Sequence, residues 1–325
     1  MGITQPDPGY HAVFYRDWLG RGYHAEMSYL ARPDAVAKRA DPRRIMAETR
    51  SILVVGVNYF QGQYPPTESP VGRVSRYAWG ADYHDVVLTK LQQLADWIEG
   101  QLGQPLACRA YVDTGPVLER GLGQRAGLGW IGKNTSLIHP RRGSYFFLGE
   151  LLLSLELTPD PPFISDHCGR CTACLDACPT GALEAPRTID AHRCISYLTV
   201  EHRGAIPTSL RPLLGDRVFG CDACQEACPW NHRFARPSSE PAFDRRQATL
   251  DLVEILTLDE DGFRRRFHCT ALWRARRAGL LRNAAVVAGN LGDPVLLPVL
   301  RAASSDPEPL VSQHAAWALR RIKGC

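Results

Sequence analysis

The chain has 325 residues, 45% of them hydrophobic, so it can bury a substantial core and we expect two or three domains. Its net charge of +4 alone says little about partners, but no apolar run is long enough to span a bilayer, and the start MGITQPDPGYHAVF is not a secretory signal. We therefore expect a cytoplasmic protein, in which eleven cysteines are poor candidates for disulfides.

Residues 1–160 predict an α/β domain. A β-branched run at 51–59 predicts a buried strand, and the spacing of apolar residues over 84–102 predicts a helix. Further strands are predicted at 107–113 and within 143–157. Between them, residues 119–136 are dense in glycine, which permits a close approach of the backbone to a ligand.

Two proline-containing linkers, at 158–163 and 235–241, divide the rest of the chain. They predict a cysteine-rich domain over 161–238 and a helical domain over 239–325. In the helical part, residues 282–293 resemble residues 313–324 at a spacing of 31 residues. A repeat of this length is typical of stacked helix pairs, so we expect HEAT-like repeats there.

Eight of the eleven cysteines lie in two groups between Cys168 and Cys228. The first group, C-x2-C-x2-C-x3-C-P, has the spacing of the bacterial ferredoxin run, in which the fourth cysteine binds a second cluster. The second group, C-x2-C-x3-C-P, lacks one ligand, which Cys194 supplies from upstream. Structural zinc is the alternative, but zinc sites rarely use a third cysteine in one run followed by proline.

The crossed pattern assigns eight ligands to two [4Fe-4S] clusters. The first cluster takes Cys168, Cys171, Cys174 and Cys228, and the second takes Cys178, Cys194, Cys221 and Cys224. The remaining Cys108, Cys269 and Cys325 are expected to be ordinary thiols.

Three segments carry a more specific resemblance. SRYAWGADYHDV (75–86), VDTGPVLERGLGQRAGLGWIGKNTSLIHPRRGSYFFLGELL (112–152) and GCDACQEACPWN (220–231) follow one another, joined to the two-cluster module and a helical tail. In this order the chain resembles the epoxyqueuosine reductase family over nearly its whole length. Members of that family usually begin with a further helix and strand, so we expect either an upstream start or a sheet that lacks an edge element.

The resemblance implies the last step of queuosine synthesis, in which the epoxide of a modified base at the wobble position of a tRNA GUN anticodon is reduced. It implies cobalamin beside the two clusters, with electrons arriving from a flavodoxin- or ferredoxin-type donor of low potential, and Asp113 as the proton donor. A positioned acid suits the chemistry because opening an epoxide leaves an alkoxide. The alternative for Asp113 is a cap of the turn DTGP.

The resemblance also implies a cobalamin site lined by polar and aromatic residues, although a glycine-rich segment can equally be only a tight loop. The expected cobalamin contacts are Asn58, Tyr77, Trp79, His84, Gly132, Lys133, Asn134, Ser136 and Ser144. Because the chain lacks the DxHxxG pattern of enzymes that supply a histidine to cobalt, we expect base-off cobalamin with no protein ligand on its lower face.

Residues 262–292 contain seven arginines and no acidic residue. Several arginines on helix ends suit a phosphate backbone, and we expect Arg274, Arg276, Arg277 and Arg282 to contact tRNA; the alternative is a solvated helix face. Two other functions use similar parts: a reductive dehalogenase with cobalamin and two clusters, and an electron carrier without a catalytic site. A monomer and no membrane association are expected.

Overall fold

A four-stranded antiparallel sheet forms the core of the first part of the computed structural model, which describes residues 1–66 and 70–324. Its order is β1-β2-β7-β4, with β1 at Gly2–Thr4, β2 at Ser51–Asn58, β7 at Phe146–Leu153 and β4 at Cys108–Tyr111. The strands predicted at 51–59 and 107–113 are confirmed, and 143–157 holds a single strand. The strand β1 occupies the edge beside β2.

Helices cover both faces of this sheet because alternate residues of its strands point to opposite sides. Leu53 and Leu151 pack toward α4 (Tyr83–Leu102), whereas Ile52 and Leu152 pack toward α5 (Glu119–Arg125). The predicted helix at 84–102 is therefore confirmed as α4. The other elements of this part are α1 (His11–Gly20), α2 (Ser28–Ala31), α3 (Pro33–Ala40), η1 (Pro42–Arg44), η2 (Arg76–Ala78), and the paired strands β5 (Trp130–Ile131) and β6 (Leu137–Ile138).

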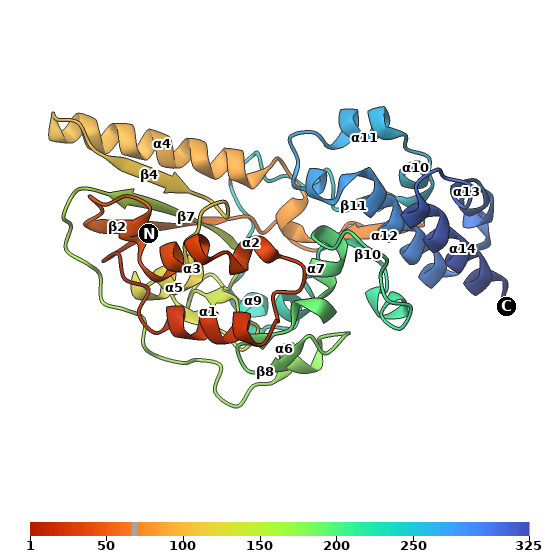
Figure 1. The fold of residues 1–325 in the computed structure, drawn as a ribbon, viewed down its shortest axis with the longest axis horizontal. Helices are drawn as coiled ribbons and strands as arrows, with labels where there is room; N and C mark the ends of the chain where they lie inside the picture. Colours follow the sequence, from red (N-terminus) through yellow and green to blue (C-terminus); the bar gives the residue numbers. More distant parts are fainter. Residues whose placement is uncertain (67–69, 325) are drawn as a thin grey trace.

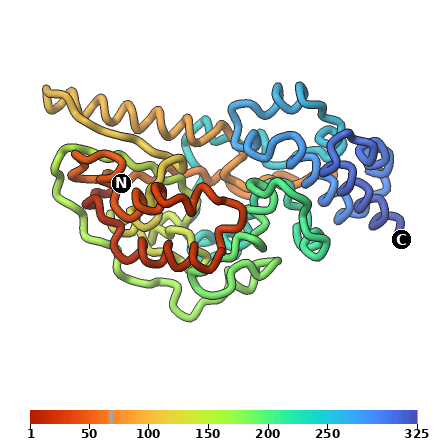
Figure 2. The backbone as a smooth tube through the Cα atoms, in the orientation of Figure 1, coloured from red at the N-terminus to blue at the C-terminus, as the bar shows by residue number. Residues whose placement is uncertain are grey.

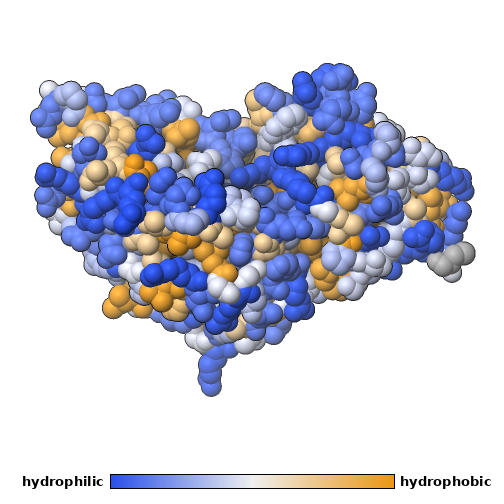
Figure 3. Space-filling model, viewed as in Figure 1, coloured by the Kyte–Doolittle hydropathy of each residue, from blue (hydrophilic) through white to orange (hydrophobic). Residues whose placement is uncertain are grey.

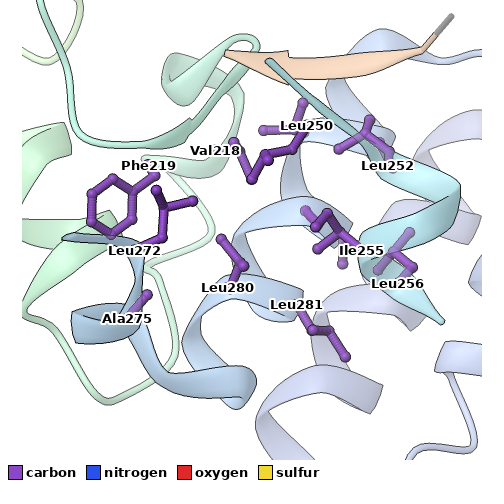
Figure 4. Close-up of a cluster of buried hydrophobic side chains, with 14 of the residues drawn as sticks. Val218, Phe219, Leu250, Leu252, Ile255, Leu256, Leu272, Ala275, Leu280 and Leu281 are labelled. Atoms are coloured by element: carbon purple, nitrogen blue, oxygen red, sulfur yellow. The ribbon is translucent and has the colours of Figure 1, made fainter. Parts of the chain in front are cut away.

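A second sheet joins all three parts of the chain. Its central strand β3 (Val71–Val74) pairs with β10 (Arg217–Phe219) from the cysteine-rich part and with β11 (Thr249–Asp251) from the C-terminal part. Behind this sheet lies a continuous apolar core, in which Val218 and Leu250 meet Leu280 and Leu281 (Figure 4). Nothing in the local pattern of the sequence predicted this sheet.

The cysteine-rich part consists of short elements connected by turns. They are α6 (Ala173–Asp176), β8 (Leu183–Ala185), β9 (Thr188–Ile189), η3 (Ala191–Arg193), α7 (Ile195–Val200), η4 (Arg211–Leu214), α8 (Ala223–Glu226) and α9 (Pro229–Phe234). The helices α6 and α8, each of which carries one cysteine, pack against each other. The tube drawing shows this part running beneath the sheets and between the two ends of the molecule (Figure 2).

The C-terminal part is helical after β11. Its elements are α10 (Leu252–Leu256), α11 (Glu260–Phe267), η5 (Ala271–Ala275), α12 (Arg276–Leu291), η6 (Pro294–Leu296), α13 (Leu297–Ala303) and α14 (Pro309–Lys323). The two similar segments lie in α12 and α14, which pack together, and both helices end at a glycine in the left-handed conformation. Cys325 lies outside the described residues.

The surface is hollowed along one edge, between the lobe that holds α4 and the lobe that holds α11 (Figure 3). The C-terminal end of β4 and the N-terminal end of α4 both point toward the middle of the molecule, where the helical part begins (Figure 1). Among the described residues, we find no helix with both the length and the apolar character that a bilayer crossing requires.

Candidate active site

Asp113 lies directly after β4, with its backbone in the left-handed region at φ +52°. Its side chain is 55% exposed, and its Oδ2 accepts a hydrogen bond of 2.6 Å from the hydroxyl of Tyr83. Burial raises the pKa of Tyr83 and the charge of Asp113 raises it further, so the phenol stays neutral and donates. The Asp113 carboxyl is therefore fixed by a hydrogen bond and remains accessible to solvent.

His84 lies beside this carboxyl in the first turn of α4. The N-cap residue Asp82 accepts from the His84 backbone nitrogen at 3.0 Å and contacts its ring Nδ1 at 2.6 Å. The other ring nitrogen, Nε2, lies 4.0 Å from Asp113 Oδ2 and is buried without a hydrogen-bond partner among the described residues. An unpartnered buried nitrogen next to an exposed carboxyl is typical of a site that a ligand completes.

Arg274 reaches the same carboxyl from the C-terminal part. Its Nη1 lies 3.8 Å from Asp113 Oδ2, and its Nε lies 4.0 Å from an oxygen of Glu201. The sequence predicted Arg274 as a tRNA contact; the structure places it at Asp113. Tyr83, His84 and Arg274 thus surround the Asp113 carboxyl, and spacing along the chain carried no signal for this convergence.

A pair of acidic side chains lies behind Asp113. The Asp113 backbone nitrogen donates to Glu119 Oε1 at 2.6 Å, and the Glu119 carboxyl adjoins that of Glu150 on β7. Burial raises the pKa of Glu119 to about 8, and the charge of Asp113 adds to that shift. Burial raises the pKa of Glu150 well above its usual range, and the charges of Glu119 and Asp113 raise it further. The sequence analysis missed both residues, because Glu150 occurs within an apolar strand.

Four of the predicted cluster ligands line one cavity. They are Cys178, Cys194, Cys221 and Cys224, which we call the inner set. Burial raises the pKa of Cys221 to about 12, and none of the four is exposed. The crossed arrangement predicted for this set therefore corresponds to an actual recess in the protein.

A buried ion pair joins the inner set to the catalytic side. Asp222, between two ligands of the set, lies 3.3 Å from Arg76 and accepts a 2.5 Å hydrogen bond from the hydroxyl of Ser75. Next to Cys221, Gly220 takes φ +70°, and a Cβ there would lie 2.5 Å from the Cβ of Ser75 and 3.2 Å from the ring of Tyr77. The Tyr77 ring in turn lies 6.0 Å from that of Tyr83.

The other predicted ligands, Cys168, Cys171, Cys174 and Cys228, form the outer set. Burial raises the pKa of Cys174, and the negative charges of the neighbouring thiolates of Cys168, Cys228 and Cys171 raise it further. Cys171 is exposed, and the indole of Trp130 donates to the sulfur of Cys168 at 3.4 Å. Aromatic rings of Phe163, His167 and Trp230 pack around Trp130.

The side chains of neither set converge on a single point. In residues 1–66 and 70–324, no three His, Cys, Asp or Glu side chains are placed so that they could bind one metal ion together. A cubane does not require such convergence, since each thiolate binds a different iron corner, whereas the zinc alternative needs four ligands around one ion. No disulfide joins the ten cysteines within the described residues.

The glycine-rich loop contacts both cysteine sets. Lys133 Nζ donates to the carbonyls of Gly169 and Cys171, at 2.7 and 2.9 Å, and Asn134 Nδ2 donates to the carbonyl of Cys224 at 3.4 Å. Gly132 and Ser136 close the turn through a backbone hydrogen bond of 2.8 Å. These residues thus hold the two cysteine loops against the first part of the chain.

Three other expected cobalamin contacts are engaged within the protein. Asn58 donates to the carbonyl of Arg236, and the Ser144 hydroxyl donates to Gln225. Trp79 is 1% exposed and donates to the carbonyl of Val74, so its ring belongs to the apolar core and offers no free surface. The expectation that Trp79 forms a wall of the site is therefore wrong.

The arginine prediction also needs correction. Arg282 is completely buried, and its guanidinium donates to the carbonyls of Leu198, His202 and Gly204, so it cannot contact a phosphate. Arg277 is paired with Asp306 at 2.5 Å. Arg276 is exposed, in a left-handed conformation. Composition showed the density of arginine but not its burial.

Comparisons with known proteins agree with this site. The 4Fe-4S double-cluster binding domain matches residues 167–231, which contain both cysteine sets, and the epoxyqueuosine reductase QueG domain matches residues 39–114, which end just after Asp113. An epoxyqueuosine reductase of Pseudomonas aeruginosa is 44% identical over 99% of this chain and 90% of the relative. That of Escherichia coli is 40% identical over 98% of this chain and 84% of the relative.

The chain belongs to the epoxyqueuosine reductase family. A solved epoxyqueuosine reductase bound to an epoxyqueuosine-modified tRNA stem loop superposes with a TM-score of 0.90 at 32% identity, covering 99% of this chain and 85% of that one. The enzyme from Bacillus subtilis, solved with its catalytic aspartate loop swung out of the active site, has a TM-score of 0.88 at 32% identity, covering 99% and 86%. Membership of this family argues against both the dehalogenase and the electron-carrier alternatives.

Proposed function

We propose that this protein reduces the epoxide of epoxyqueuosine in tRNA to the alkene of queuosine, with Asp113 as the proton donor. The observation that carries the proposal is the short connection from the inner cysteine set to Asp113, through Gly220, Tyr77 and Tyr83. The reaction consumes two electrons and two protons and releases the epoxide oxygen as water. A carboxyl near the electron source supplies a proton where the carbon–oxygen bond breaks.

Electrons reach the site, in this proposal, through two [4Fe-4S] clusters. The outer set includes the exposed Cys171 and is the side at which a flavodoxin- or ferredoxin-type donor of low potential delivers electrons. The inner set lies between the outer set and the catalytic residues, and α6 and α8 bring the two sets together. Cluster potentials depend on hydrogen bonds to sulfur and on solvent exposure, and both differ between the sets.

Cobalamin fits the Asp113 end of this arrangement. The unpartnered Nε2 of His84 and the half-exposed carboxylate of Asp113 are polar groups that a bound cofactor or substrate completes. Bound cobalamin supplies a strongly reducing cobalt centre, and we propose the base-off form without a protein ligand on its lower face. Tyr77 and His84 remain proposed contacts, together with the backbone of the loop from Gly132 to Ser136.

The substrate in this proposal is a tRNA with a queuosine-type GUN anticodon. Arg276 is an exposed cation two residues beyond Arg274, which is suitable for a phosphate near the catalytic carboxyl. We propose that residues 1–160 bind cobalamin, 161–238 bind the clusters and 239–325 contact tRNA through HEAT-like repeats, in a monomeric cytoplasmic enzyme.

The decisive experiment reconstitutes the protein anaerobically with iron, sulfide and cobalamin, adds a strong reductant, and supplies tRNA that bears epoxyqueuosine. Mass spectrometry of the digested nucleosides then measures the loss of one oxygen. Conversion to queuosine is the expected result, and Asp113→Asn should retain the cofactors yet lose at least about a hundredfold in turnover, the usual contribution of a general acid. Intact clusters and bound cobalamin without conversion would refute the proposal, and full activity of the variant would remove Asp113 as the acid.

A further inference from the structure

Glu119 and Glu150 occupy an unusual position behind the Asp113 loop, residues 112–118. Glu150 is the only charged residue in β7, FFLGELLL, and it is 0% exposed. It lies on the face of the sheet that packs against α5, among Val54, Leu148 and Leu152. No N–H or hydroxyl among the described residues donates to either of its carboxyl oxygens, and the polar group beside it is the Glu119 carboxyl, with which it can form a hydrogen bond once one of the two is protonated.

The two carboxyls cannot both be ionised in this environment. A buried charge without a partner is strongly unfavourable, and two adjacent carboxylates repel each other as well. The charged groups that act on the pair are Asp113, which is also acidic, and Arg120 on α5. Arg120 donates to the carbonyl and hydroxyl oxygens of Thr135, so it does not neutralise Glu150. Facing Glu150 across the strands are Val54 and the phenol of Tyr111.

We propose that Glu119 and Glu150 share a proton, and that this acid pair holds the Asp113 loop in its catalytic position. In the protonated pair, Glu150 donates to one oxygen of the Glu119 carboxylate, while the other oxygen accepts the backbone N–H of Asp113. Glu119 and Glu150 are thus positioning residues for the proposed proton donor, and their role in catalysis rests on the proposed function.

The loop needs such support because its conformation is strained. Asp113 takes φ +52°, which is unfavourable for a residue with a side chain, and the 2.6 Å hydrogen bond to Glu119 is the contact that fixes its amide. Gly115 approaches the ring of Tyr111 so closely that an added Cβ would lie 2.3 Å from it. When the pair loses its proton, repulsion from Glu150 and Asp113 drives Glu119 toward solvent, and the loop loses its anchor.

A two-position loop is consistent with a solved relative. In the Bacillus subtilis enzyme the catalytic aspartate loop is swung out of the active site, so this segment of the family adopts more than one conformation. In the present chain the protonated acid pair gives a chemical reason for the closed conformation, in which the Asp113 loop stays in the active site. The closed loop predominates while Glu150 keeps the shared proton and gives way as pH rises through the pKa of Glu150, which burial and the charges of Glu119 and Asp113 raise well above its usual range.

Hydrogen–deuterium exchange of the reconstituted protein, with both clusters and cobalamin bound, tests this directly. The measured quantity is the protection of the peptide containing residues 113–119 between about pH 6.5 and about pH 10.5, corrected for the chemical exchange rate. In the unmodified protein we expect protection to hold while Glu150 is protonated and then to fall by about tenfold for each pH unit above its pKa. Glu150→Gln should abolish this fall, because the amide donates to Glu119 at every pH.

Two further variants keep the test interpretable if Glu150→Gln does not fold. Glu119→Gln retains an oxygen that accepts the Asp113 N–H and also cannot ionise, so its protection should be independent of pH. Glu156→Gln is the matched control: Glu156 lies just beyond the same strand with its side chain 81% exposed, and it should behave as the unmodified protein does. A pH-independent unmodified protein, or an unchanged fall in both Glu119→Gln and Glu150→Gln, would overturn the proposal.

Kinetics separate positioning from mere structure. The pH at which kcat falls on the alkaline side should move higher in Glu150→Gln. A structural defect would instead lower kcat at all pH values without moving that pH. The two proposals also fail separately. If Asp113→Asn stays active while the exchange behaves as expected, the acid assignment is wrong and the acid pair stands; if the variant is inactive and the exchange is independent of pH, only the acid pair is refuted.

Discussion

The outer and inner cysteine sets have similar spacing along the chain but very different surroundings. The outer set includes an exposed residue, Cys171, and receives an N–H···S hydrogen bond from Trp130. The inner set lines a recess, and the ion pair of Arg76 and Asp222 beside it is 2% exposed on both sides. Spacing therefore predicts the ligands, whereas the remainder of the fold determines what surrounds each cysteine set.

This difference gives the module a direction. The outer set reaches solvent at Cys171, although its Cys228 is buried, and the inner set lies next to Ser75 and Tyr77, which lead to Tyr83 and Asp113. The glycine-rich loop holds the two sets together, since Lys133 binds the outer loop and Asn134 the inner one. In the proposed function, electrons would enter at the outer set and leave from the inner one.

The largest expected effect comes from breaking the inner set alone. Cys178→Ser alters a residue of the first cysteine run that lines the inner recess, so it should eliminate the inner cluster, retain the outer one and abolish turnover. Electron paramagnetic resonance and iron content per chain measure the clusters. Cys269→Ser is the control, because Cys269 is exposed and belongs to neither set. Loss of the outer cluster instead would contradict the crossed assignment.

The second effect concerns the ion pair beside the inner set. Arg76→Met leaves the buried carboxylate of Asp222 without its cation, and breaking a buried pair in this way costs about 3–5 kcal/mol in the free energy of unfolding. Glu226, 2.6 Å from Arg76, loses its partner as well. Urea denaturation of the anaerobic protein, followed by tryptophan fluorescence, measures the loss.

The matched control is the exposed pair of Arg246 and Asp244, with side chains 62% and 41% exposed. Arg246→Met should change the free energy of unfolding by less than about 1 kcal/mol, because solvent screens exposed ion pairs. Equal effects of the two substitutions would show that the inner set has no specially buried surroundings.

Local patterns predicted the parts of the molecule that depend on local chemistry. The cysteine spacing predicted that Cys178, Cys194, Cys221 and Cys224 would lie together, and periodicity predicted β2 and α4. The sheet of β10, β3 and β11 escaped prediction because its strands are three or four residues long and come from distant parts of the chain. Arg282 was misjudged because composition does not reveal burial, and a lone glutamate within FFLGELLL gives no sign of the Glu119 carboxyl that α5 brings next to it.

The smallest expected effect tests the outer set. The indole N–H of Trp130 stabilises negative charge on the sulfur of Cys168, so it favours the reduced cluster. Trp130→Phe keeps an aromatic ring in the cage and removes only this donor. Loss of a hydrogen bond worth about 1 kcal/mol should make the potential of the outer cluster about 40 mV more negative.

A redox titration followed by electron paramagnetic resonance measures both clusters in the same sample, so the inner cluster serves as an internal reference and should not shift. Trp230→Phe is the control variant, since Trp230 packs against Trp130 at 4.9 Å between ring centroids without donating to Cys168. Equal shifts in both variants would attribute the effect to packing or solvent access. A shift in the potential of the inner cluster alone would show that Trp130 acts on the inner cluster and not on the outer one. It would also remove the proposed chemical distinction between the entry and the exit of electrons.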